Sequence, residues 1–143
     1  LYRSRCLVFG YGRCASILAD RLKGMGAGVT VAGRDASRLV QAHCLGYDTC
    51  LLKELESVIG EFDFIFNTIP SLVLDGALVK QLQENAAVID IASAPGGVDF
   101  QALKRRNIRA RLCPGLPGRY SPHSSAIILY EAVMEHIRDS QTQ

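Results

Sequence analysis

The segment Cys6-Leu7-Val8-Phe9-Gly10-Tyr11-Gly12-Arg13-Cys14-Ala15 decides the fold of this chain. Its first four residues form an apolar run, which is typical of a strand buried on both faces of a parallel sheet. Apolar residues then recur with helical spacing from Ala15 to Leu22. A glycine-rich turn between a strand and a helix predicts a unit that binds a dinucleotide.

Each position of the G-x-G-x-x-A turn has a physical role in that interpretation. Gly10 permits the tight turn, and Gly12 lacks a Cβ, so a pyrophosphate can approach the backbone. Ala15 is small enough for the helix to pack closely on the strand. The N–H groups of Tyr11 through Cys14 and the positive end of the helix dipole then face the phosphates. The alternative is that the glycines serve only the turn.

Outward from this unit, apolar runs alternate with helical patterns. Further strands are expected near residues 29–32, 48–51, 62–66, 86–92 and 107–113, and helices near 35–43, 55–59, 75–82 and 99–106. A rigid loop over 114–118 precedes a last helix that begins at Ser121 and Pro122. The alternation predicts an α/β fold, a doubly wound (Rossmann) parallel sheet of about six strands in the order 3-2-1-4-5-6, with helices on both faces.

The residues after the second predicted strand bear on the choice of dinucleotide. NAD sites usually have a carboxylate there, whereas this chain has Gly33. Arg34 and Arg38 follow and suit the 2′-phosphate of NADP, because a guanidinium pairs with two phosphate oxygens at once. Asp35 is either the N-cap of the next helix or a ribose ligand in an NAD site. The charge pattern favours NADP, with NAD as the alternative; a solvated arginine pair is the remaining interpretation.

Loops that follow the later strands should lie at the same edge of the sheet, where ligands bind in open α/β folds. We expect the loop Asn67-Thr68-Ile69-Pro70 to lie opposite the glycine turn and to line the nicotinamide ribose. Two stiff loops allow a flat ring or another domain to approach; their candidate substrate-side residues are Ser93, Pro95, Gly96, Gly115, Leu116, Pro117 and Gly118. His123 is a weak candidate for proton transfer. Asp90, inside an apolar strand, is expected to be hydrogen-bonded support.

Composition excludes several other classes of protein. Hydrophobic residues make up 48% of the 143 positions, too many for a disordered chain, and no apolar run reaches the roughly 18–20 residues that span a bilayer. A net charge of +2 and the absence of tryptophan give no support for nucleic-acid binding. The basic run over residues 104–111 is interpreted as solvated. Five cysteines without a C-x-x-C pair are expected to be reduced and mostly buried, and no histidine spacing suggests a metal site.

Three later motifs are more specific than the glycine turn. They are Phe66-Asn67-Thr68-Ile69-Pro70, the run from Ile89 to Ser93 with Pro95-Gly96-Gly97 and Asp99-Phe100, and Pro114-Gly115-Leu116-Pro117-Gly118. With their order and spacing, the chain resembles the C-terminal nucleotide-binding domain found in the family of dipicolinate synthase A subunits, over essentially its whole length. Its start at Leu1 then suggests one domain, residues 1–143, taken from a longer chain without its N-terminal domain.

The resemblance implies an NAD(P)-dependent oxidoreductase that oxidises a dihydrodipicolinate-type compound to dipicolinate during sporulation. It further implies that the partner is a flavoprotein-like B subunit. The setting would be the mother-cell cytoplasm of a spore-forming bacterium. Arg119 would meet a substrate carboxylate. The family's lysine near position 123 is absent here, and the isolated domain is expected to be inactive. A domain of the shikimate dehydrogenase type and a non-catalytic nucleotide sensor remain alternatives.

Overall fold

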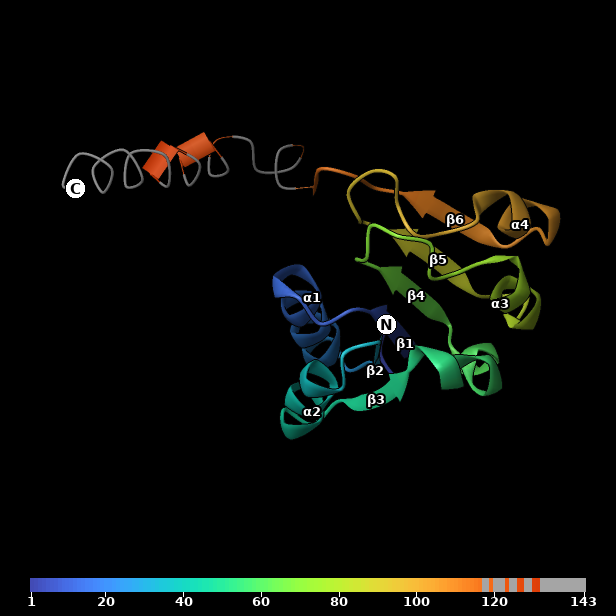
Figure 1. The fold of residues 1–143 in the computed structure, drawn as a ribbon, viewed down its shortest axis with the longest axis horizontal. Coiled ribbons are helices and arrows are strands. Elements are labelled where there is room, and N and C mark those ends of the chain that lie inside the picture. The colour runs from blue at the N-terminus through green and yellow to red at the C-terminus, as the bar shows by residue number, and fades with distance from the viewer. Residues whose placement is uncertain (117–118, 120–122, 124–125, 128–129, 132–143) are drawn as a thin grey trace.

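A parallel six-stranded sheet forms the centre of the structure, a computed structural model that describes residues 1–116, 119, 123, 126–127 and 130–131 (Figure 1). The strand order is β3-β2-β1-β4-β5-β6, as the sequence predicts. The strands are β1 (Arg5–Phe9), β2 (Gly28–Gly33), β3 (Asp48–Leu51), β4 (Phe64–Asn67), β5 (Ala87–Asp90) and β6 (Arg109–Leu112). The order reverses at β1, so a crevice opens between the carboxyl ends of β1 and β4.

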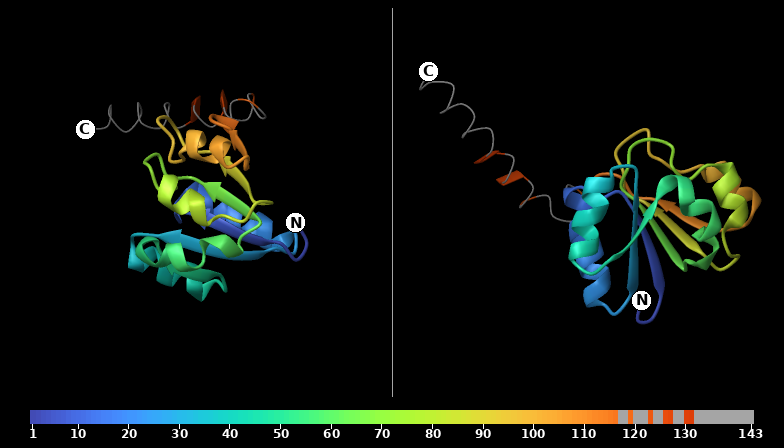
Figure 2. Two further views of the ribbon diagram at one scale, coloured as in Figure 1. Left: turned by 90° about the vertical axis from the view of Figure 1, so that its right-hand side faces the viewer. Right: turned by 60° about the horizontal axis from the view of Figure 1, so that its bottom comes forward.

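Helices cover both faces of this sheet, as predicted (Figure 2). On one face lie α1 (Arg13–Gly24) and α2 (Ala36–Cys44). On the other lie α3 (Gly76–Gln81), α4 (Phe100–Arg105) and the 3₁₀ segments η1 (Leu52–Ser57) and η2 (Ile59–Glu61). The short helix expected near residues 55–59 is therefore a pair of 3₁₀ turns. Among the described residues, no helix is long and apolar enough to cross a bilayer.

The apolar run of β1 separates two hydrophobic cores. Cys6 and Val8 pack beneath α1 and α2, whereas Leu7 and Phe9 pack on the opposite core. All four side chains are fully buried. Alternate residues of a strand point to opposite faces, so a strand in the middle of a covered sheet must be apolar throughout. The buried strand therefore fixes the position at which the following glycine turn begins, at the carboxyl end of the sheet.

Side chains at helix ends define where α2, α3 and α4 begin and end. Asp35 and Asp99 accept hydrogen bonds from backbone N–H groups in the first turns of α2 and α4, as the sequence predicts for these N-caps. Asp75 caps α3 in the same way. Arg106 donates to three carbonyls at the end of α3. One residue of the basic run is therefore a structural tie, while Lys104 and Arg105 are exposed as expected.

The segment after β6 departs from the prediction of a loop followed by a helix at Ser121. Leu116 and Arg119 are already helical, and the N–H of Arg119 donates to the carbonyl of Gly115 at 3.1 Å. Pro114 and Gly115 precede the first helical residue, Leu116, and a proline before a helix costs it no hydrogen bond. Ser121 and Pro122 lie outside the described residues.

Candidate dinucleotide site

A cavity of about 310 Å³ opens at the carboxyl ends of β1, β2 and β4. It lies where the strand order reverses, the place at which ligands bind in doubly wound sheets. Most of the predicted cofactor residues line it: Gly10, Tyr11, Gly12, Gly33, Arg34, Asp35, Arg38, Thr68, Ile69 and Pro70. Residues from three predicted motifs, far apart in sequence, thus surround one space.

The two glycines of the turn differ in what they do. Gly10 has φ +89°, and a Cβ there would lie 3.0 Å from Thr68 Oγ1 and 3.1 Å from Ile69 Cγ1. At Gly12, φ is −86° and a Cβ would meet only Arg38 Nη1, at an ordinary 3.8 Å. The fold therefore explains glycine at position 10 but not at position 12. A ligand that approaches the backbone explains the second glycine.

The first turn of α1 suits an anion. No side chain caps it, and the first turn carries no acidic residue. Free N–H groups and the positive end of the helix dipole lie at this point, and both favour a phosphate. Ala15 is fully buried in the core between α1 and the sheet, as expected for a small residue at a close helix–strand contact.

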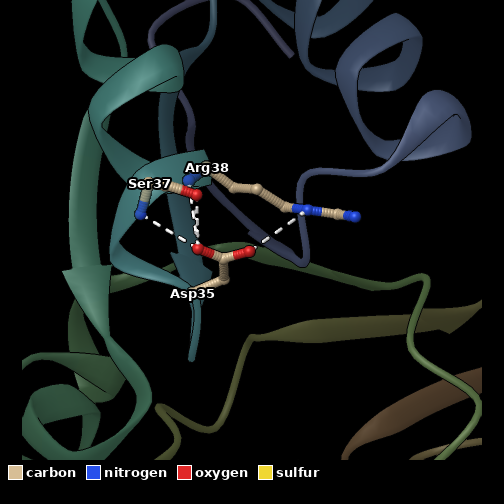
Figure 3. A network of polar contacts seen from close by, with 3 residues as sticks. All are labelled: Asp35, Ser37 and Arg38. Atoms are coloured by element: carbon tan, nitrogen blue, oxygen red, sulfur yellow. Dashed lines mark hydrogen bonds and ion pairs between the residues drawn. The ribbon is translucent and has the colours of Figure 1, made fainter.

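Asp35, Ser37 and Arg38 form a polar network at the start of α2 (Figure 3). The Asp35 carboxylate accepts from Ser37 N at 2.9 Å and Ser37 Oγ at 2.6 Å, and its other oxygen lies 3.4 Å from Arg38 Nε. The Ser37 hydroxyl is the main cause of a lowered pKa for Asp35, and the Arg38 and Ser37 N–H groups and the Arg38 charge add to it. Asp35 is thus the N-cap of α2. A contact between Asp35 and a cofactor ribose stays a prediction.

Arg34 and Arg38 lie at the end of the cavity formed by β2 and α2. Both residues line it and both are exposed. The Arg38 side chain extends from α2 past Asp35, and its Nη1 lies close to the glycine turn (Figure 3). Gly33 adds no carboxylate at the same end. Two cations and the Asp35 carboxylate therefore border a space whose other polar wall is an uncapped helix terminus.

The opposite wall is the loop after β4, as predicted. Thr68 Oγ1 donates to the carbonyl of Phe9 at 2.8 Å, which ties this loop to the end of β1. The prediction that Asn67 lines the cavity is wrong. Its side chain is fully buried, because it bonds Ile69 and Asp90 at the junction of the loops after β4 and β5 instead of facing the cavity. Asp90 is hydrogen-bonded support, as expected.

Other predicted residues contribute differently from expectation. Arg13 and Cys14 begin α1, are exposed and do not line the cavity. The ring of Tyr11 packs edge-on against Tyr47, with centroids 6.1 Å apart, and burial, helped by the charge of Asp20, raises the pKa of Tyr11. Leu39 lines the cavity and was not predicted, because an apolar residue on the inner face of α2 is typical of core.

The substrate-side candidates do not reach this cavity. Ser93 and Pro95 are exposed and Gly96 is half-buried, in a loop that packs beside the one after β4. Gly115 and Leu116 follow β6, and Pro117 and Gly118 lie outside the described residues. Arg119 and His123 are exposed and helical. None of the described candidates in this set is among the cavity's lining residues.

The cysteines are more accessible than predicted. Cys6 is buried, Cys50 and Cys113 are half-buried, and Cys14 and Cys44 are exposed; all five are free thiols. Both exposed thiols lie in helices, Cys14 in α1 and Cys44 in α2. Burial, together with the charge of Asp63, raises the pKa of Cys6 to about 11.

Comparison with known proteins adds to this geometry. No protein-family model matches the chain. The A subunit of dipicolinate synthase from Bacillus subtilis (strain 168) is 29% identical over 143 residues, which is 100% of this chain and 48% of that protein. The chain resembles this protein over its own whole length. It spans about half the length of the curated relative, and the family resemblance predicted from the later motifs is confirmed.

Solved structures agree. The A chain of Bacillus subtilis dipicolinate synthase superposes with a TM-score of 0.93 at 30% identity, covering 99% of this chain and 47% of that one. The A subunit of Bacillus halodurans dipicolinate synthase gives 0.89 at 30% identity, over 94% and 46%. An L-alanine dehydrogenase, at 16% identity over 83% of this chain and 38% of its own, gives 0.66 and shares the fold. The homology and the cavity together support an NAD(P)-binding domain of oxidoreductase type.

Proposed function

We propose that this chain is the NADP-binding domain of an enzyme similar to the A subunit of dipicolinate synthase. The observation that carries the proposal is the cavity bordered by Gly12, the uncapped start of α1, and Arg34 and Arg38. Each element matches one part of the cofactor. The glycine and the helix terminus suit the diphosphate, and the two guanidiniums suit the 2′-phosphate. NAD is the alternative cofactor.

The chain's own groups would bind and orient the cofactor. The N–H groups of α1 would donate to the diphosphate, and the wall formed by Thr68, Ile69 and Pro70 would border the nicotinamide ribose. When bound, NADP⁺ supplies a hydride acceptor. Among the described residues that line the cavity, the ionisable ones are Tyr11, Arg34, Asp35 and Arg38.

The substrate and the partner follow from the resemblance alone. We infer oxidation of a dihydrodipicolinate-type ring to dipicolinate, in a complex with a flavoprotein-like B subunit, in the cytoplasm of a sporulating mother cell. A carboxylated ring would need a cation, and Arg119 is the predicted one. A second candidate function is a nucleotide sensor, favoured by the observation that none of the described substrate-side candidates lines the cavity.

Alkylation of the two exposed cysteines tests cofactor binding directly. Cys14 lies in the first turn of α1, next to the proposed diphosphate site, whereas Cys44 is the last residue of α2. We expect saturating NADP to slow the labelling of Cys14 by iodoacetamide several-fold and to leave Cys44 unchanged. Mass spectrometry of the labelled peptides measures both rates in one sample. Cys6, with a pKa of about 11, should stay unlabelled at pH 8.

The same reaction has an informative contrary result. Equal rates for Cys14 with and without nucleotide, at concentrations where calorimetry detects binding, would contradict a diphosphate bound over the first turn of α1. If calorimetry detects neither NADP nor NAD, the dinucleotide proposal fails altogether. Protection by NAD but not by NADP would keep the site and reverse the choice of cofactor.

A further inference from the structure

Two polar side chains are buried where β4 and β5 end. Asn67 and Asp90 are each 0% exposed, and they occupy paired positions in the register of the two strands. They are the buried polar or charged residues among those that the structure describes. A buried amide and a buried carboxyl in a sheet interior are costly unless their hydrogen bonds are made. Their partners therefore show what the pair holds.

The hydrogen bonds join two loops to each other. Asp90 accepts from Asn67 Nδ2 at 2.9 Å, from Ala92 N at 2.9 Å and from Gly97 N at 3.0 Å. Asn67 Nδ2 also donates to the carbonyl of Ile69 at 3.0 Å, and Asn67 Oδ1 accepts from Ile69 N at 3.0 Å. One side chain thus folds the loop after β4, and the other folds the loop after β5. The bond between them fixes one loop against the other.

Glycines allow the loops to approach this closely. A Cβ on Gly97 would lie 2.5 Å from the carbonyl oxygen of Ile69 and 2.6 Å from Asn67 Nδ2. At Gly96, where φ is +81°, a Cβ would lie 2.9 Å from Asp90 Oδ2. Side chains at either position would separate the loops. Because the backbones are in contact, a displacement of the loop after β5 must displace the loop after β4.

We propose that Asn67 and Asp90 are positioning residues for the nicotinamide half of the dinucleotide site. The inference rests on the proposed cofactor binding. Thr68, Ile69 and Pro70 follow Asn67 directly and form one wall of the cavity. The adenosine end is bordered by Gly33, Arg34 and Arg38, and none of the hydrogen bonds of the pair reaches these residues. A change in the pair moves one wall and leaves the other in place.

The variant Asn67→Asp tests the pair with a built-in control. It keeps an acceptor for Ile69 N, removes the donor to the Ile69 carbonyl, and replaces the donor to Asp90 by a second carboxyl. When the two carboxyls share a proton, an O–H group replaces the N–H donor to Asp90 but not the one to the Ile69 carbonyl; when both ionise, they repel each other. Asp75 and Asp99, on the adjoining helices, are occupied with their own helix N-termini. The pH dependence of the variant is therefore assigned to the two carboxyls at positions 67 and 90.

The readout is the affinity for two ligands, NADP and its adenosine fragment 2′,5′-ADP, each compared with the unaltered chain at the same pH. As the pH rises from 5.5 to 8.5, we expect the NADP affinity of Asn67→Asp to fall about tenfold relative to that of the unaltered chain, with 2′,5′-ADP affinity unchanged. Asp90→Asn should lose a similar factor at every pH. Asp75→Asn, which changes a carboxylate that accepts from backbone N–H groups of α3 outside the junction, is the matched control and should bind both ligands normally.

Each other outcome has a defined meaning. If the unaltered chain binds neither ligand, the proposed function fails before the inference is reached. If Asn67→Asp and Asp90→Asn bind both ligands as the unaltered chain does, or lose both in equal proportion, the pair does not position the nicotinamide wall. Variants that are unfolded at the binding temperature, as judged by circular dichroism, also overturn the inference, because the pair would then serve the fold as a whole.

Discussion

Replacing Gly12 by valine is expected to abolish dinucleotide binding in a chain that still folds. At φ −86° valine is allowed, and the nearest atom to its Cβ would be Arg38 Nη1, the end of a flexible side chain, at 3.8 Å. The valine side chain would fill the space that the diphosphate needs next to the backbone. We expect the dissociation constant for NADP to rise by more than about a hundredfold, and the loss of a favourable N-cap residue to cost about 1 kcal/mol of stability. Calorimetric titration and thermal unfolding measure the two effects.

Gly10→Ala provides the contrasting variant. Its φ of +89° and the contacts with Thr68 and Ile69 predict a loss of stability of about 1–3 kcal/mol. The turn thus contains one glycine for the fold and one for the ligand. Unchanged NADP affinity in the folded Gly12→Val chain would mean that the phosphate site lies elsewhere.

Arg34→Ala is expected to weaken NADP binding and to leave NAD binding nearly unchanged. A hydrogen bond to a charged group contributes roughly 1.5–3 kcal/mol, which corresponds to about ten- to a hundredfold in affinity. Arg38→Ala should have a smaller effect, because Arg38 is already paired with Asp35 at 3.4 Å. Dissociation constants of both nucleotides for both variants check the difference.

Two further variants separate the arginines from Asp35. Gly33→Asp should shift preference toward NAD, because a carboxylate there repels the 2′-phosphate and accepts from free ribose hydroxyls. Its Cβ would meet Leu39 at an ordinary 3.5 Å, so the fold should accept it. Asp35→Asn keeps an acceptor for the cap of α2 and removes a negative charge, so NADP should bind more tightly. If Asp35→Asn instead weakens NAD binding alone, Asp35 holds the ribose. Equal losses of NAD and NADP affinity in Arg34→Ala would remove the basis for choosing NADP as the cofactor.

The sequence predicts the sheet because its main signals are local. Four consecutive apolar residues before a glycine turn predict β1, and all four are fully buried in the structure. The alternation of strands with helices then predicts the order of the strands in the sheet. The end of the cavity formed by β2 and α2 was predictable for the same reason. Gly33, Arg34 and Arg38 are close in sequence to one strand end, so their meeting place follows once that strand is located.

Features that depend on contacts between distant segments were not predictable in the same way. Asn67 is polar and follows an apolar strand, a position that suggests a ligand for the ribose. Its true partner, Asp90, is 23 residues away, and the bond between them requires the register of β4 and β5. The start of the helix after β6 was missed because prolines and glycines near Gly115 suggested a loop. Leu39 was missed because a residue can pack in the core and still border a cavity.

The hydrogen bond from Thr68 to the carbonyl of Phe9 has a thermodynamic consequence. With the bond from Gly10 N to the carbonyl of Ala32, it ties the ends of β1, β2 and β4 together before any ligand arrives. A rim tied in this way loses less conformational entropy when a ligand enters, so less of the free energy of the new contacts is spent on ordering the loops. A ligand at this rim would also exchange without waiting for a loop to fold.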